Sequence, residues 1–164
     1  MDFSIPRLAC VDRSASSSIA VRHNERSISY GELDQASSRV ANGLVALGVM
    51  AEDRVAIVSR NNIESIEVLL GISKVGAVPV FLNWRLSPRE IADLLEDAKP
   101  VVVFLQQEFA DGLRTTLSEQ TFRAAVLVFD SSEHQLSYRH WKGQYESDLE
   151  LAGDQPEDVA AQLY

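Results

Sequence analysis

The stretch RVAIVSRNNIESIEVLLGISKVGAVPVFL, residues 54–82, contains the pattern of a strand, a helix and a second strand in succession. Its first part, 54–59, is short and rich in β-branched residues, which favours a buried strand. Asn61 or Asn62 is suited to cap the helix that follows, in which apolar residues recur at helical spacing. The apolar run at 77–82 is a second strand. Two strands joined through a helix form a βαβ unit, so this stretch predicts a parallel sheet.

The same alternation continues on both sides of this unit. Upstream, Ser29-Tyr30-Gly31-Glu32 has the spacing of a capping box and begins a helix that Gly48 ends. Downstream, Ser87-Pro88 begins another helix, with proline at the favoured first position. The other expected elements are strands at 101–105 and 124–129, with a weaker helix at 109–119 between them. The predicted fold class is therefore α/β, built from βαβ layers with helices on both faces of a parallel sheet.

Residues 1–28 and 130–158 lack this alternation of strands and helices. Residues 1–28 are expected to be an N-terminal lead-in, and residues 29–164 to form one α/β subdomain. Within the subdomain, residues 130–158 are acidic and show no clear period, so they are interpreted as a surface excursion. The closing DVAAQLY, residues 158–164, has the pattern of a strand that is starting.

Composition excludes several classes of protein. The chain has 164 residues, of which 46% are hydrophobic, enough for a core of its own. A net charge of -9 argues against nucleic-acid or anionic-membrane binding, which requires a basic face. A single cysteine, Cys10, excludes an internal disulfide or a cysteine-based zinc site. The sequence shows neither a signal peptide nor the roughly 20 apolar residues of a membrane span, which predicts a cytoplasmic protein.

The titratable residues do not form a recognisable catalytic or metal-binding group. His23, His134 and His140 are too scattered for a metal site and are expected to be solvent-exposed. Carboxylates such as Glu64 and Glu67 fall on predicted polar helix faces and are expected to be solvated. The sequence also contains no glycine-rich phosphate loop of either common type. No catalytic residue and no metal ligand is therefore predicted.

One position favours a ligand. Asn83, Trp84 and Arg85 follow a predicted strand and precede a helix start, and open parallel sheets bind ligands beyond the carboxyl ends of their strands. The N–H groups of a helix start favour an anion, and Arg85 adds a bidentate charge. Trp84 could stack on a flat ring or shield the loop. The alternative is that Trp84 packs against a neighbouring subdomain and Arg85 is a surface charge.

Several short motifs occur together in one order and spacing, and none of them is specific alone. They cover roughly residues 15–164 and read Ser29-Tyr30-Gly31-Glu32-Leu33, Ala46-Leu47-Gly48-Val49, Asp53-Arg54-Val55-Ala56-Ile57, Lys74-Val75-Gly76-Ala77-Val78-Pro79-Val80 and Leu82-Asn83-Trp84-Arg85-Leu86. Together they resemble the adenylate-forming superfamily of acyl-CoA synthetases, luciferase-like ligases and peptide-synthetase adenylation domains. The Asn-x-Arg-Leu form at residues 83–86 is similar to the acyl-CoA and aryl-CoA synthetase branch.

This resemblance implies a cofactor and two binding residues. In that branch, the arginine at the position of Arg85 contacts the phosphate of coenzyme A in some members, and its neighbours line the approach of the nucleotide. Arg85 and Trp84 are therefore expected to be cofactor-binding residues. The parent enzyme is expected to use ATP, Mg²⁺ and coenzyme A. It would convert a fatty or aryl carboxylic acid first into an acyl-adenylate and then into a thioester.

The resemblance also implies that the chain is incomplete. Such enzymes continue after a segment like residues 158–164 into a Ser/Thr- and Gly-rich phosphate loop, whereas this sequence stops at Tyr164. The chain is expected to be a partial N-terminal subdomain, without ligase activity and without a tightly bound cofactor. Its uncovered apolar surface is expected to support a homodimer.

Two other interpretations belong to different classes. The chain could be a stand-alone, non-catalytic α/β binding or regulatory module. A response-regulator-like receiver is disfavoured, because it needs an acidic pair after the first strand. Here that strand is followed by Arg60-Asn61-Asn62.

Overall fold

The computed structural model describes residues 16–118, 121, 123–131, 137–148 and 162–163. Cys10 and His134 lie outside the described residues. In the part of the chain that is described, no helix is both long and apolar enough to span a lipid bilayer.

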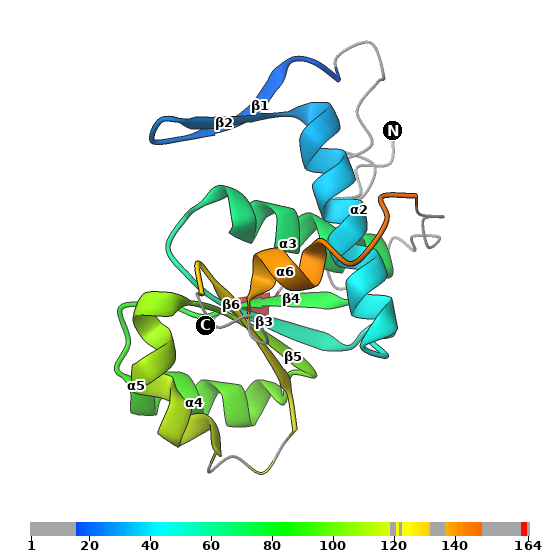
Figure 1. Cartoon of the computed structure of the whole chain (residues 1–164). Helices are drawn as coiled ribbons and strands as arrows, with labels where there is room; N and C mark the ends of the chain where they lie inside the picture. Colours follow the sequence, from blue (N-terminus) through cyan, green and yellow to red (C-terminus); the bar gives the residue numbers. More distant parts are fainter. Residues whose placement is uncertain (1–15, 119–120, 122, 132–136, 149–161, 164) are drawn as a thin grey trace.

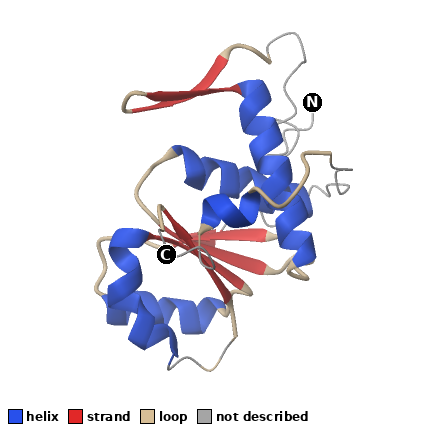
Figure 2. Cartoon of the chain, viewed as in Figure 1, coloured by secondary structure: helices blue, strands red, loops and turns tan. Residues whose placement is uncertain are grey.

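The centre of the molecule is a parallel sheet, as the sequence predicts (Figure 2). It has five strands in the order β6-β5-β3-β4-β7. They are β3 (Arg54–Val58), β4 (Val78–Phe81), β5 (Val102–Gln106), β6 (Ala125–Phe129) and β7 (Gln162–Leu163). Each neighbouring pair is parallel, so the carboxyl ends of all five strands lie at one edge. The strand expected at the end of the chain is β7, which pairs with β4.

Helices cover both faces of the sheet (Figure 1). One face packs against α2 (Tyr30–Ala46), α3 (Ile63–Val75) and α6 (Tyr138–Lys142), and the other against α4 (Pro88–Ala98) and α5 (Gln107–Ser118). Alternate residues of a strand point to opposite faces, so Val55 and Ile57 of β3 join one buried cluster and Ala56 and Val58 join the other. A strand buried on both faces explains the continuous apolar runs of the sequence.

The helix starts follow the predicted capping chemistry. Ser29, Asn62 and Ser87 each accept a hydrogen bond from the backbone N–H three residues on, completing a capping box in each case. The cap of α3 is therefore Asn62, not Asn61. Gly76 ends α3 in the left-handed conformation, with φ 76°, and Gly48 adopts φ 84° after α2.

A β-hairpin that the sequence did not predict precedes α2. It consists of β1 (Ile19–His23) and β2 (Arg26–Ser29), paired antiparallel, and it extends away from the central sheet (Figure 1). Arg26 in β2 forms an ion pair of 2.7 Å with Glu64 of α3. The hairpin is therefore tied to the helical layer by a contact distant in sequence.

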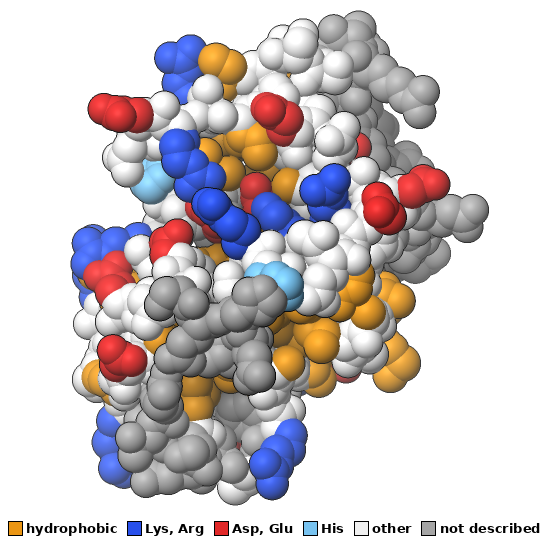
Figure 3. Space-filling view, viewed as in Figure 1, with side chains coloured by type: hydrophobic (Ala, Val, Ile, Leu, Met, Phe, Trp, Pro, Cys, Tyr) orange, Lys and Arg blue, Asp and Glu red, His pale blue; other side chains and the backbone are white. Residues whose placement is uncertain are grey.

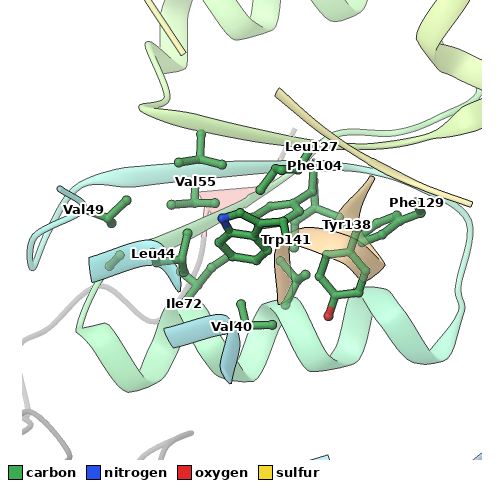
Figure 4. Packing of buried hydrophobic residues seen from close by; sticks show 14 residues of the cluster. Val40, Leu44, Val49, Val55, Ile72, Phe104, Leu127, Phe129, Tyr138 and Trp141 are labelled. Atoms are coloured by element: carbon green, nitrogen blue, oxygen red, sulfur yellow. The ribbon is translucent and has the colours of Figure 1, made fainter. Parts of the chain in front are cut away.

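The expectation of a surface excursion over residues 130–158 is wrong for α6. Tyr138 is 2% exposed and Trp141 7% exposed, and both belong to the cluster that α2 and α3 form with the sheet (Figure 4). Trp141 lies so close to α2 that a Cβ added to Gly43 would be 2.4 Å from its Cζ2. The absence of a side chain at Gly43 thus lets this short helix enter the core.

The expectation of a solvated carboxylate is also wrong for Glu67. Glu67 is only 4% exposed, and its carboxylate accepts hydrogen bonds from Tyr138 Oη at 2.6 Å and from Lys142 Nζ at 2.5 Å. The face of α3 that carries Glu67 is covered by α6, which supplies both donors. Glu64, in contrast, is only partly buried and bonds the exposed Arg26.

Candidate functional site

The loops that follow β3, β4 and β5 meet at the carboxyl edge of the sheet. Arg60 follows β3, Trp84 and Arg85 follow β4, and Phe109 lies in the first turn of α5, directly after β5. These strands are neighbours in the order β5-β3-β4, which brings residues far apart in sequence together. The sequence predicted Trp84 and Arg85 at this edge.

The loop after β3 is held in place by side-chain hydrogen bonds. Gln106, the last residue of β5, accepts a bond from the Arg60 backbone N–H at 2.9 Å and from Ser59 Oγ at 3.3 Å. Asn62, which caps α3, donates from Nδ2 to the same Ser59 Oγ at 2.9 Å. The backbone of Arg60 is therefore fixed relative to two strands and one helix.

Trp84 contacts two guanidinium groups. The Cζ atoms of Arg60 and Arg85 lie over its ring, 4.3 and 4.2 Å from the ring centroid. The ring of Phe109 stacks at 6.0 Å between centroids, with 30° between the planes. A cation over an aromatic face contributes about 0.5–1 kcal/mol at a solvent-exposed site, so the Trp84 ring restrains both arginine side chains. The sequence left open whether Trp84 stacks on a ligand or shields the loop. The structure adds a third role, as the platform for Arg85.

The two arginines differ in their partners. Arg60 forms a bidentate ion pair with Glu108, with Nε 2.8 Å from Oε1 and Nη2 3.0 Å from Oε2. The Arg85 guanidinium forms no ion pair with any described residue, and its backbone N–H donates to Asn83 Oδ1 at 3.1 Å. Arg85 is exposed. No described carboxylate therefore neutralises its positive charge, and its role in binding stays a prediction.

The start of α4, next to Arg85, contributes less than its sequence indicates. Glu90 accepts hydrogen bonds from the Ser87 N–H and hydroxyl, and Ser87 accepts one from the Glu90 N–H. These bonds from Ser87 lower the pKa of Glu90, so a carboxylate already lies at the helix end. Pro88 has no N–H to offer. An anion at this edge would therefore depend mainly on the Arg85 side chain.

The site contains two residues that the sequence interpretation missed, Arg60 and Glu108. Both follow strands of the same sheet, as Arg85 does, and that shared position is the signal that could have revealed them. Among the described residues, no group of three or more His, Cys, Asp or Glu could hold a metal ion. His23 lies in β1 and His140 in α6.

Comparison with known families identifies the group to which the fold belongs. A family model described as AMP-binding enzyme matches residues 9–164. The chain belongs to this family. The match agrees with the adenylate-forming motifs of the sequence, and it includes the edge that carries Arg60, Trp84 and Arg85.

Several curated relatives of this AMP-binding chain are CoA ligases. A 3-hydroxybenzoate/4-hydroxybenzoate–CoA ligase of Thauera aromatica is 32% identical over 143 residues, which is 85% of this chain and 27% of the relative. A medium/long-chain-fatty-acid/3-oxocholest-4-en-26-oate–CoA ligase of Mycobacterium tuberculosis is 29% identical over 125 residues, 76% of this chain and 23% of the relative. The chain spans about a quarter of the length of these relatives.

Solved structures show the same fold. An anthranilate CoA ligase, AuaEII, in complex with anthranoyl-AMP superposes with a TM-score of 0.90 at 22% identity, over 97% of this chain and 30% of that protein. A benzoate CoA ligase from Burkholderia xenovorans LB400 gives a TM-score of 0.86 at 21% identity, over 98% of this chain and 32% of that protein. The α/β fold of this chain therefore matches about a third of each of these two ligase structures.

Proposed function

We propose that the chain is the N-terminal part of an ATP-dependent carboxylate–CoA ligase. The observation that carries this proposal is the match to the AMP-binding family over residues 9–164, together with curated relatives that include an aryl–CoA and a fatty-acid–CoA ligase. The parent enzyme would join an aromatic or fatty acid to coenzyme A through an acyl-adenylate. ATP would supply the adenylyl group for the first step, with pyrophosphate as the leaving group, and Mg²⁺ would stabilise the charge of the triphosphate.

The carboxyl edge of the sheet fits one part of such an enzyme, the coenzyme A phosphate site. Arg85 presents a planar guanidinium that can form two parallel hydrogen bonds to a phosphate. It has no carboxylate partner among the described residues, and Trp84 limits its movement from one side. In this proposal Arg85 binds the phosphate and Trp84 positions Arg85.

We expect Arg85→Ala, introduced into the longer ligase, to raise the KM for coenzyme A about tenfold, because a charge-assisted pair of hydrogen bonds is lost. Adenylate formation should change little, since its clamping groups would lie elsewhere. ATP–pyrophosphate exchange measures the first half-reaction, and thioester formation measures the second.

The matched control is Arg22→Ala, because Arg22 is an exposed arginine in β1. Equal losses in both half-reactions for Arg85→Ala would show that Arg85 is structural. The 164-residue chain by itself should give background exchange, because it contains no glycine-rich phosphate loop. Exchange above background in that sample would contradict the proposed assignment to a part of the enzyme.

We also propose that the chain self-associates through exposed apolar side chains. Hydrophobic residues gather around the C-terminal end of α2 and the turn after it (Figure 3). There Val45 is 55%, Leu47 43% and Met50 69% exposed. Light scattering should show a mass that rises with concentration, and Met50→Glu should lower it by inserting a charge into the patch. A single monomer mass for the unaltered chain across a wide concentration range would refute self-association.

A further inference from the structure

The Arg60–Glu108 ion pair lies beside Arg85 and is not explained by the proposed role of Arg85 alone. Arg60 and Arg85 lie over the same indole, with their Cζ atoms 4.3 and 4.2 Å from its centroid, so both positive charges lie against one ring. Glu108 balances one of them through a bidentate contact. Among Arg60, Arg85 and Glu108 this leaves one positive charge without a carboxylate partner, and the Glu90 carboxylate lies nearby, bonded to Ser87 at the start of α4.

The carboxylate contact of Arg60 is of a kind that a phosphate can replace. A carboxylate and a phosphate present two oxygens to a guanidinium in the same fork geometry. The side chain of Arg60 is 52% exposed and that of Glu108 40% exposed. Exposed ion pairs contribute only about 0–1 kcal/mol, so an incoming anion displaces the carboxylate at small cost.

The anchoring of Arg60 is suited to such an exchange. Its backbone N–H is fixed by Gln106 at 2.9 Å, and its guanidinium rests on Trp84, which Arg85 shares. The head group can therefore change its hydrogen-bond acceptor without any movement of the loop or loss of the aromatic contact.

We propose that Arg60 is a second phosphate-binding residue of this edge and that Glu108 competes with the ligand for it. The ligand class is a nucleotide with two separate phosphate groups, such as the 3′-phosphate and 5′-diphosphate of coenzyme A. One group binds Arg85 and the other replaces Glu108 on Arg60. This inference rests on the proposed function, which supplies the ligand class.

Competition by Glu108 predicts changes in ligand affinity that a general attraction between charges does not predict. Glu108→Gln frees Arg60 and should tighten ligand binding about two- to fivefold, the range expected for an exposed pair. Arg60→Gln should weaken binding by a similar factor. In the double variant Arg60→Gln/Glu108→Gln, the gain from Glu108→Gln should disappear, because the residue for which Glu108 competes is absent.

Isothermal titration calorimetry of the 164-residue chain provides the test, with adenosine 3′,5′-bisphosphate and coenzyme A as probes at low and high salt. Charge-matched controls in the hairpin are Arg22→Gln and Glu25→Gln, both exposed. The controls should bind within twofold of the unaltered chain. Binding should weaken with salt in every variant that retains a free arginine.

Three outcomes would overturn the inference. The first is that Glu108→Gln does not raise the affinity for the probes. The second is that it raises the affinity equally in the presence and absence of Arg60. The third is that neither probe binds at millimolar concentration. Where the unaltered chain binds a probe, Arg85→Gln distinguishes failure of the role proposed for Arg60 from failure of the proposed function. If Arg85→Gln weakens binding and the Arg60 and Glu108 variants do not change it, only the role proposed for Arg60 is refuted. If Arg85→Gln binds normally, the assignment of Arg85 to the coenzyme A site fails as well.

Discussion

Replacing Glu67 with alanine is expected to lower the free energy of unfolding by about 3 kcal/mol, because it breaks a buried, charged hydrogen-bond network. Tyr138 and Lys142 of α6 both donate to Glu67 Oε2. The Tyr138 hydroxyl points out of the aromatic cluster toward α3 (Figure 4). Without Glu67, that hydroxyl is left buried without a partner, at a cost comparable to a lost hydrogen bond and its desolvation.

Urea unfolding followed by circular dichroism measures this effect, and two variants calibrate it. Glu64→Ala removes a carboxylate one turn away whose partner, Arg26, is 57% exposed, so it should cost less than about 1 kcal/mol. Glu67→Gln keeps an acceptor for Tyr138 and should fall between the two. A loss for Glu67→Ala no larger than that for Glu64→Ala would show that α6 is held by its apolar contacts alone.

Local signals allowed much of the fold to be predicted. The strands and the starts of α2, α3 and α4 follow from short apolar runs and from capping residues such as Ser29 and Ser87, whose effect is confined to a few neighbours. The two-stranded hairpin was missed because its residues, from Ile19 to Ser29, alternate too weakly to indicate a strand. Such hairpins depend on tertiary contacts, here the ion pair from Arg26.

Tertiary contacts also explain why α6 and Glu67 were misjudged. A helix from Tyr138 to Lys142 is too short to show an apolar period. Because α6 was not predicted, nothing in the sequence indicated that the face of α3 carrying Glu67 would be covered. Buried carboxylates are rare without a partner, and the partners here are more than 70 residues away in sequence.

In the candidate site, too, only the residues with a local sequence signal could be predicted. Arg85 could be assigned from a rule about strand ends and from a family motif, both of which are local in sequence. The pairing of Arg60 with Glu108, and the sharing of Trp84, depend on the strand order β5-β3-β4. That order places the loops after three strands side by side. The resulting edge carries two arginines on one aromatic ring, an arrangement that the sequence alone does not reveal.

Gly71→Ala is expected to destabilise the chain by about 2 kcal/mol, although alanine favours helices over glycine. Gly71 lies on the side of α3 that packs against α2. A Cβ there would lie 2.4 Å from Val40 Cγ1, 2.6 Å from Val40 Cβ and 3.0 Å from the Ser37 carbonyl oxygen. Rotation of Val40 relieves only the first contact, because its Cβ and the carbonyl oxygen are fixed by the backbone. The two helices must therefore separate, which opens gaps in the core below them.

The matched control is Gly112→Ala in α5, which makes the same change in helix propensity at an exposed position. A Cβ at Gly112 meets only Pro88 Cγ, at 3.3 Å. Its effect should lie between neutral and a gain of about 1 kcal/mol. The difference between the two variants in thermal and urea unfolding isolates the steric term, since propensity cancels. Equal stabilities would mean that α2 and α3 can move apart without cost, and the close contact at Gly71 would then carry no steric penalty.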